Sequence, residues 1–118
     1  MSSNKKIRIV SSPMPLLELK NIAAEQFGDM IKVVVDLEKH IMAIGGELHA
    51  DEEAALLDQG SAQSNLWGLN IYVDAPRDSW IEFDSMINIR PSQGNPSRYI
   101  GKVEIQKQLT KIVNSLIQ

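Results

Sequence analysis

Residues 66–90 read LWGLNIYVDAPRDSWIEFDSMINIR, and this stretch decides the fold. Successive side chains of a strand point to opposite faces, so the alternation of apolar and polar residues predicts two antiparallel, half-buried strands, over residues 66–73 and 80–90. The apolar face is predicted to hold Trp67, Leu69, Ile71, Val73, Ile81, Phe83, Ile87 and Ile89. The opposite face is predicted to hold Asn70, Tyr72, Trp80, Glu82, Asp84, Met86, Asn88 and Arg90. A β-bulge near residues 84–86 would reverse these faces for half of the second strand.

The rest of the sequence predicts three helices and three more strands. Apolar residues at helical spacing predict two longer helices, over residues 16–27 and 102–116. Three acids in a first turn, Asp51, Glu52 and Glu53, and a closing Gly60 predict one short helix, over residues 51–59. Short apolar runs predict the strands, over residues 6–10, 30–36 and 41–44. The chain of 118 residues therefore predicts one α+β domain, residues 1–118, with a single largely antiparallel sheet of about five strands and with helices on one face.

The composition excludes several classes of protein. The chain has 43% hydrophobic residues and no cysteine, so it can bury a core without disulfides or thiolate metal sites. A net charge of −3 argues against dedicated nucleic-acid binding, which needs many phosphate contacts. The sequence has no recognisable secretory signal and no apolar run that could span a membrane, so a cytoplasmic protein is expected.

The charge is distributed unevenly along the chain. Residues 90–118 hold five basic residues and one acidic residue, whereas the whole chain is negative. Such asymmetry favours a small anionic ligand or a homo-oligomer built from unlike faces. The simpler alternative is that these basic residues form the solvated face of the last helix.

Weak candidates for catalysis lie in two places, and no cofactor can be named. If the chain is extended up to Asp51, then Glu47, His49 and Asp51 point to one side and suggest a metal-dependent or acid–base enzyme. A catalytic metal generally needs three protein ligands, and the only other histidine is His40, so no metal site is assigned. The alternative is that the acids cap a helix while His49 makes a structural hydrogen bond. Asp84 is a further acid–base candidate, provided that something buries it.

An anion site is the leading prediction for the loop that follows residue 90. A chain that doubles back at Gly94 and Asn95 would bring the guanidinium groups of Arg90 and Arg98 to one anion. Three residues of the polar strand face complete the predicted ligand-binding set, with hydrogen bonds from two amides and a contact surface from an indole: Asn70, Asn88 and Trp80. The alternative is that Arg90 pairs with Glu82 or Asp84, or that both arginines are solvated.

Three stretches, IGGELHADEEAALLDQGS, NLWGLNIY and WIEFDSMINIRPSQGNPSR, together resemble a small uncharacterised prokaryotic family of unknown function. The resemblance covers nearly the whole chain and implies no activity, cofactor or partner. It extends to the positions of Glu47, His49, Asp51, Trp67, Gly68, Asn70, Glu82, Asp84, Arg90, Gly94, Asn95 and Arg98. The chain departs from the family pattern at His40, where glycine is expected in the hairpin turn, and at Pro96, where a basic residue is expected.

Overall fold

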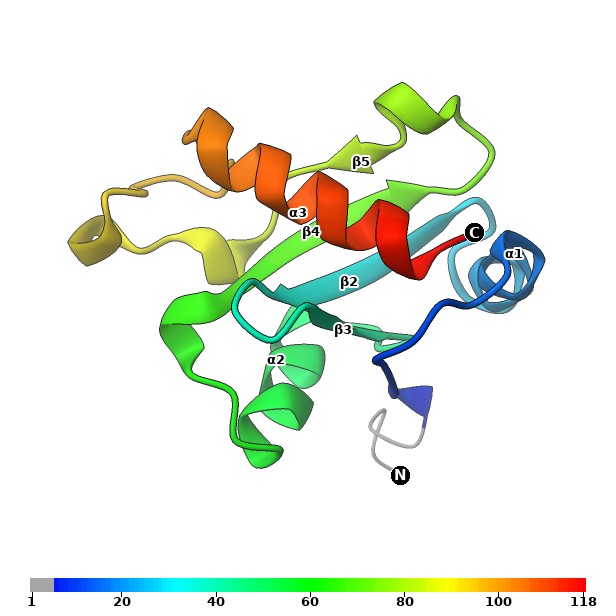
Figure 1. The fold of residues 1–118 in the computed structure, drawn as a ribbon, viewed down its shortest axis with the longest axis horizontal. Coiled ribbons are helices and arrows are strands. Elements are labelled where there is room, and N and C mark those ends of the chain that lie inside the picture. The colour runs from blue at the N-terminus through cyan, green and yellow to red at the C-terminus, as the bar shows by residue number, and fades with distance from the viewer. Residues whose placement is uncertain (1–5) are drawn as a thin grey trace.

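Five strands form one antiparallel sheet in the computed structural model, which describes residues 6–118. The strands are β1 (Arg8–Val10), β2 (Met30–Asp36), β3 (Ile41–Ile44), β4 (Leu66–Tyr72) and β5 (Ile81–Glu82), in the spatial order β1-β3-β2-β4-β5. The helices are α1 (Leu16–Gln26), α2 (His49–Asp58) and α3 (Val103–Leu116) (Figure 1). The predicted α+β class is therefore confirmed. The prediction about a secretory signal falls partly on residues 1–5, which lie outside the described residues.

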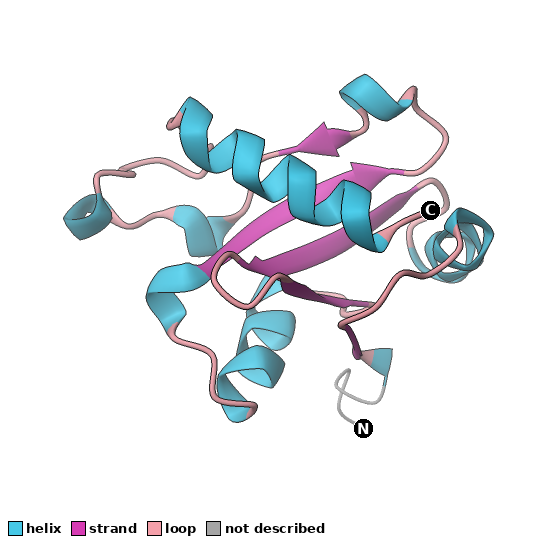
Figure 2. Cartoon of the chain, in the orientation of Figure 1, coloured by secondary structure: helices cyan, strands magenta, loops and turns pink. Residues whose placement is uncertain are grey.

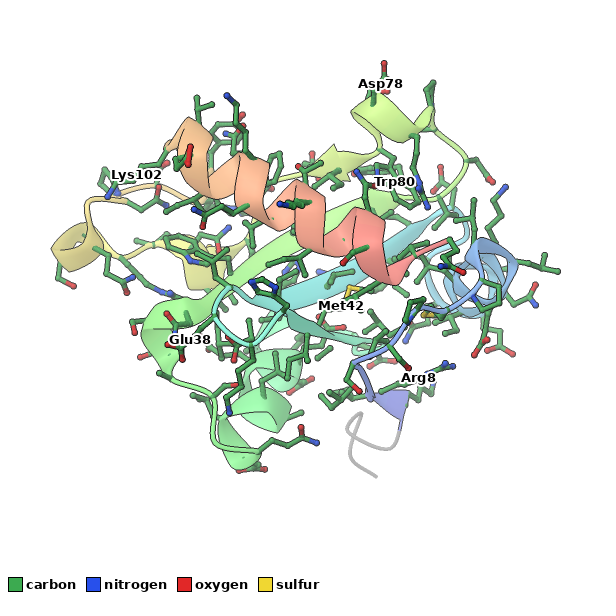
Figure 3. The ribbon with its side chains drawn as sticks, viewed as in Figure 1. Arg8, Glu38, Met42, Asp78, Trp80 and Lys102 are labelled. Atoms are coloured by element: carbon green, nitrogen blue, oxygen red, sulfur yellow. The ribbon has the colours of Figure 1, made fainter. Side chains whose placement is uncertain are left out.

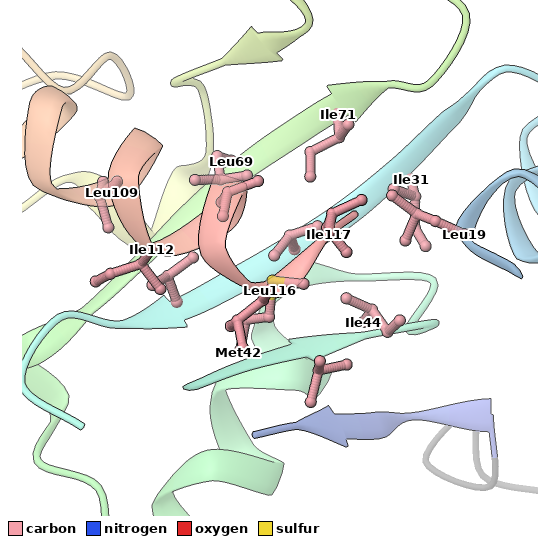
Figure 4. Close-up of a cluster of buried hydrophobic side chains, with 14 of the residues drawn as sticks. Leu19, Ile31, Met42, Ile44, Leu69, Ile71, Leu109, Ile112, Leu116 and Ile117 are labelled. Carbon is pink, nitrogen blue, oxygen red and sulfur yellow. The ribbon is translucent and has the colours of Figure 1, made fainter. Parts of the chain in front are cut away.

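The helices cover both faces of the sheet, so the prediction that they pack on one face is wrong. Val33 and Val35 of β2 point into a large apolar cluster beneath α1 and α3 (Figure 4). Val34 points the other way, into a smaller cluster with Leu56 of α2. Because neighbouring residues of a strand face opposite sides, an uninterrupted apolar run such as Val33–Val35 is typical of a strand that is covered on both faces.

The register of the strands places three polar side chains in a row. Lys32 of β2 is the partner of Asn70 of β4, and Asn70 is the partner of Glu82 of β5. Since Lys32 and Val34 are two residues apart, this row lies on the face that carries α2. Helix α2 covers the apolar end of that face, which leaves the polar row beside its first turn.

The second predicted strand is much shorter than residues 80–90. Regular pairing stops at Glu82, and a 3₁₀ turn follows at Met86–Asn88, as the mostly irregular chain between β5 and α3 shows (Figure 2). The segment crosses over Gly68 of β4, where a Cβ atom would lie 2.6 Å from the Cβ atom of Ser85. The faces therefore change after residue 84: Ile87 packs against the α2 cluster, and Ile89 is 40% exposed.

Trp80 does not lie on the polar face, and that prediction is wrong. Its side chain is 1% exposed and belongs to the large apolar cluster, between α3 and the turn that carries Asp78 (Figure 3). The backbone of Trp80 is helical, with φ −84° and ψ −15°, so strand alternation does not extend back to this residue. Arg77 lies over the Trp80 ring, with its Cζ atom 4.2 Å from the ring centroid.

Candidate functional site

A hollow of about 160 Å³ lies on the α2 face of the sheet, where the first turn of α2 meets the polar row and the crossing segment. We call it the His49 hollow. Its lining residues are Lys32, Leu48, His49, Asn70, Asp84, Ser85, Met86, Ile87 and Arg98. Two apolar side chains of its lining are largely exposed, Leu48 at 57% and Met86 at 64%. A larger hollow of about 500 Å³ lies beside β1 and α1, but none of the side chains that line it is fully buried. The smaller hollow therefore has the more constrained chemistry.

His49 is the first residue of α2, and its imidazole is held in one tautomer. The ring is 8% exposed, and Nε2 lies 2.8 Å from the carbonyl oxygen of Leu69. A carbonyl oxygen can only accept, so Nε2 carries the hydrogen and Nδ1 of the neutral ring keeps a lone pair. Burial lowers the pKa of His49 and outweighs the opposing hydrogen bond to Leu69. The charge of Lys32 lowers the pKa further, against smaller opposing effects of Asp84 and Asn70. The imidazole is therefore neutral near pH 7.

Asn70 forms the floor of the hollow and has one unused hydrogen-bonding atom. Its side chain is 7% exposed, and Nδ2 donates to Glu82 Oε1 at 2.9 Å and to the Asp84 carbonyl oxygen at 3.3 Å. Within residues 6–118, no donor reaches Oδ1, although this atom is buried. Buried acceptors without a donor are uncommon in folded proteins and are often found where a ligand or water binds.

Two cations also line the hollow, and they differ in their partners. Arg98 donates from Nε to Asp84 Oδ1 at 2.9 Å and from Nη2 to Asp84 Oδ2 at 3.1 Å, which is a bidentate pair. Lys32 is half-buried and forms no salt bridge with any residue in the described part of the chain. Its Nζ atom lies 5.6 Å from the centroid of the Phe27 ring. Lys32 is therefore the cation whose charge is available to a ligand.

Asn88 and Asn95, two of the predicted ligand-binding residues, use their amides in hydrogen bonds that hold the loop together. Asn88 is fully buried, accepts from the Gly68 N–H at 2.8 Å and donates to the carbonyl oxygens of Gly68 and Arg98. Asn95 donates to the carbonyl oxygens of Asn88, Ser97 and Tyr99 and accepts from the Gly101 N–H. These two amides supply the hydrogen bonds that a regular strand would have made between backbones.

The predicted reversal of the loop at Gly94 and Asn95 is present. Gly94 has φ +78°, and Arg90 and Asn95 exchange two backbone hydrogen bonds across the turn, of 2.6 and 3.0 Å. A positive φ of this kind favours glycine. The turn does not bring the two guanidinium groups together, because Arg98 lines the His49 hollow and Arg90 does not.

The side chain of Arg90 is buried against the first residue of β4. Its side chain is 9% exposed, donates to the carbonyl oxygens of Ile87 and Leu66, and lies 3.6 Å from Glu53 Oε2. The guanidinium lies over the Trp67 ring, with Cζ 4.8 Å from the centroid, while Nη1 has no hydrogen-bond acceptor in residues 6–118. Burial lowers the pKa of Arg90, and Glu53 opposes that shift. The alternative in which Arg90 pairs with Glu82 or Asp84 is therefore wrong, because Arg90 pairs with Glu53 and Arg98 pairs with Asp84.

The residues Glu47, His49 and Asp51 do not form a common site. Helix α2 begins at His49, two residues earlier than predicted, so the extended chain that would align the three side chains is not present. Residues two apart on a helix point in different directions, and Glu47 is exposed before the helix starts. In the described part of the chain, no group of three or more histidine and acidic side chains could hold a metal ion.

Two ionisable residues beside the hollow were missed from the sequence. Lys32 is the one charged residue inside the strand MIKVVVD before its terminal acid. A charge that interrupts an apolar strand was the signal that could have marked Lys32 as a candidate. The sequence indicates Glu52 only as an acid near the start of the short helix, but its side chain is fully buried one turn after His49 and accepts from the Gly46 N–H at 2.9 Å. Burial raises the pKa of Glu52 well above its usual range. The burial of Glu52 follows from its position on the inner face of α2, which the sequence pattern did not indicate.

Comparison with known proteins adds a family but no activity. No curated protein and no solved structure matches the chain. No helix in residues 6–118 is long and apolar enough to cross a membrane. A family model described as protein of unknown function, DUF5674, matches residues 8–116. The chain therefore belongs to this family of proteins of unknown function.

Proposed function

We propose that the protein binds a small anion, of the size of a short-chain carboxylate, in the His49 hollow. The observation that carries the proposal is Lys32, a half-buried cation that lines the hollow and has no carboxylate partner among the described residues. A buried or half-buried charge is normally paired, because removing it from water is costly. An anion in the hollow would supply the missing partner.

The surroundings of Lys32 support the same ligand class. The hollow lies at the start of α2, where the first N–H groups of a helix lack partners within the helix and favour negative charge. Arg98 also lines it, held in place by Asp84. The residues of the predicted anion site therefore fall into two groups. Arg98 and Asn70 belong to the proposed site, whereas Arg90, Asn88 and Asn95 belong to the loop that supports it.

The size and lining of the hollow favour a few heavy atoms. Its volume of about 160 Å³ corresponds to roughly five waters at about 30 Å³ each. Pockets for drug-sized ligands are larger, on the order of 300–1,000 Å³. Leu48 and Met86 offer exposed apolar surface beside the polar floor, which suits an anion that carries a short aliphatic chain.

Titration of the protein with formate, acetate, propionate and inorganic phosphate tests the proposal. We expect saturable binding of a carboxylate, followed by NMR, and a weaker affinity in Lys32→Met. A single charge at contact distance in water-like surroundings contributes about 1 kcal/mol, or roughly fivefold in affinity. Lys107→Met, which removes an exposed lysine from α3, is the matched control and should bind as the unsubstituted protein does. Equal affinities in both variants would contradict the site.

A further inference from the structure

We infer that the His49 hollow binds its anion together with one proton, which Nδ1 of His49 takes up and shares with the side-chain oxygen of Asn70, while Nε2 keeps its hydrogen bond to the carbonyl oxygen of Leu69. This inference rests on the proposed anion site. It starts from a mismatch: a site for an anion should present donors, yet two atoms of its lining residues, His49 Nδ1 and Asn70 Oδ1, are acceptors before a ligand binds. A proton on Nδ1 turns this pair of acceptors into a donor and an acceptor.

The orientations of both side chains are fixed, so neither can remove the mismatch by turning over. Nε2 of His49 must keep its hydrogen for the Leu69 carbonyl oxygen. The Nδ2 group of Asn70 must keep facing Glu82 Oε1 and the Asp84 carbonyl oxygen, because a flipped amide would place its own oxygen against two acceptors. Protonation of Nδ1 is therefore the change that satisfies every atom of the pair, and the Asn70 side chain is placed to stabilise the protonated ring.

With an anion bound, the charges around the hollow balance only after that proton is added. From the sheet and the crossing segment, Lys32 and Arg98 contribute two positive charges, while Glu82 and Asp84 contribute two negative charges. On α2, burial favours the neutral form of Glu52 and raises its pKa, against the opposing effects of the Gly46 hydrogen bond and the charge of Lys32, while the charge of Asp51 raises it further. Before a ligand binds, two positive and two negative charges therefore surround the hollow, although Lys32 forms no salt bridge with either acid. A bound monoanion that pairs with Lys32 would leave the group with one negative charge in excess. An imidazolium at His49 would neutralise it.

The proton balance of binding follows directly. Neutral His49, a free carboxylate and one proton from the buffer give an imidazolium and a bound carboxylate, with no covalent bond formed or broken. In the empty protein, burial and Lys32 oppose the imidazolium and lower the pKa of His49. The bound anion reverses the electrostatic part of that effect and raises the pKa of His49. Binding should therefore take up close to one proton at a pH between the two values.

Isothermal titration calorimetry with acetate, in buffers of different ionisation heat, measures the proton uptake. Near pH 7 we expect uptake approaching about one proton per acetate, and an affinity that falls up to roughly tenfold per pH unit as the pH rises. His49→Gln is the informative variant, because its amide nitrogen can still donate to the Leu69 carbonyl oxygen although the side chain no longer titrates. It should bind acetate without proton uptake. His40→Gln, at an exposed histidine in the β2–β3 turn, should keep the full uptake.

NMR of the imidazole ring gives a second measurement on the unsubstituted protein. Saturating acetate should raise the pKa of His49, whereas the ring resonances of His40 should not respond to acetate. Acetate binding without proton uptake at any pH between about 6 and 8 would overturn the inference and leave the proposed anion site intact. Unchanged uptake in His49→Gln would also overturn it. Absence of binding by every carboxylate tested would overturn the inference and the proposed function together.

Discussion

The loop over residues 87–98 and the His49 hollow lie next to each other and are both rich in polar side chains, yet they differ in how these side chains are paired. In the loop, Asn88 and Asn95 use their amides on backbone groups that no strand partner reaches. In the hollow, Asn70 is also buried but has an oxygen without a donor, and Lys32 forms no salt bridge within the described chain.

The pairing of buried polar groups distinguishes residues that stabilise the fold from residues that could bind a ligand. A buried polar network that is satisfied internally stabilises one conformation and has nothing left to offer a ligand. A cluster with unused acceptors and an unpaired cation carries a free-energy cost that binding can recover. By this criterion most of the conspicuous loop residues support the fold, while the hollow beneath them is the place to look for function.

Asn88→Ala should produce the largest effect and tests the structural half of the comparison. The substitution leaves the N–H and carbonyl groups of Gly68 and the carbonyl oxygen of Arg98 without their side-chain partner in the interior. We expect a loss of about 3 kcal/mol in the free energy of unfolding, measured by urea denaturation. Asn114→Ala, at an exposed position on α3, is the control and should stay within about 0.5 kcal/mol. A loss below about 1 kcal/mol for Asn88→Ala would remove the structural role of this residue.

The two arginines provide the sharpest contrast between the regions. Arg90→Met should cost about 2 kcal/mol in stability, because it removes buried hydrogen bonds and leaves Glu53 without its cation. Arg98→Met should cost less than about 1 kcal/mol, because its pair with Asp84 is partly exposed. For acetate binding the order should be reversed, with Arg98→Met weaker than the unsubstituted protein and Arg90→Met unchanged. If the two variants changed stability by the same amount and also changed acetate binding by the same amount, the different roles assigned to Arg90 and Arg98 would be contradicted.

Glu52→Gln should have the smallest effect in acid, and the effect should grow with pH. The folded state raises the pKa of Glu52 above its unfolded value, so the unsubstituted protein is stabilised by the bound proton in acid and loses this contribution as pH rises through the folded pKa. Glutamine stays neutral and can still accept from the Gly46 N–H. Thermal denaturation of both proteins across a pH series should show the variant gaining relative stability with pH. A constant difference at all pH values would mean that Glu52 is not held neutral.

The sequence predicts the elements whose pattern is long and local. The alternation over residues 66–73 is confirmed, since Trp67, Leu69, Ile71 and Val73 all lie in one buried cluster. The last helix is confirmed because its apolar stripe recurs over four turns, with Leu109, Ile112, Val113 and Leu116 buried. His49, Asn70, Asp84 and Arg98 were also named as candidates, although in three separate hypotheses.

Features that depend on distant contacts were not predicted. The strand over residues 80–90 ends early because its chain crosses Gly68, and the meaning of that glycine depends on which segment lies above it. The row of Lys32, Asn70 and Glu82 depends on the register of three strands. His49 joins that row because α2 packs on the second face of the sheet, which the alternation pattern alone did not indicate.

Chemical-shift mapping of the unsubstituted protein with acetate tests the central claim most directly. Saturable changes at the amides of residues 48–50, 70 and 84–85, with residues 91–95 unchanged, are the result expected if the hollow binds the anion and the loop only supports it. Changes centred on residues 91–95, or no saturable change at any amide, would contradict the account.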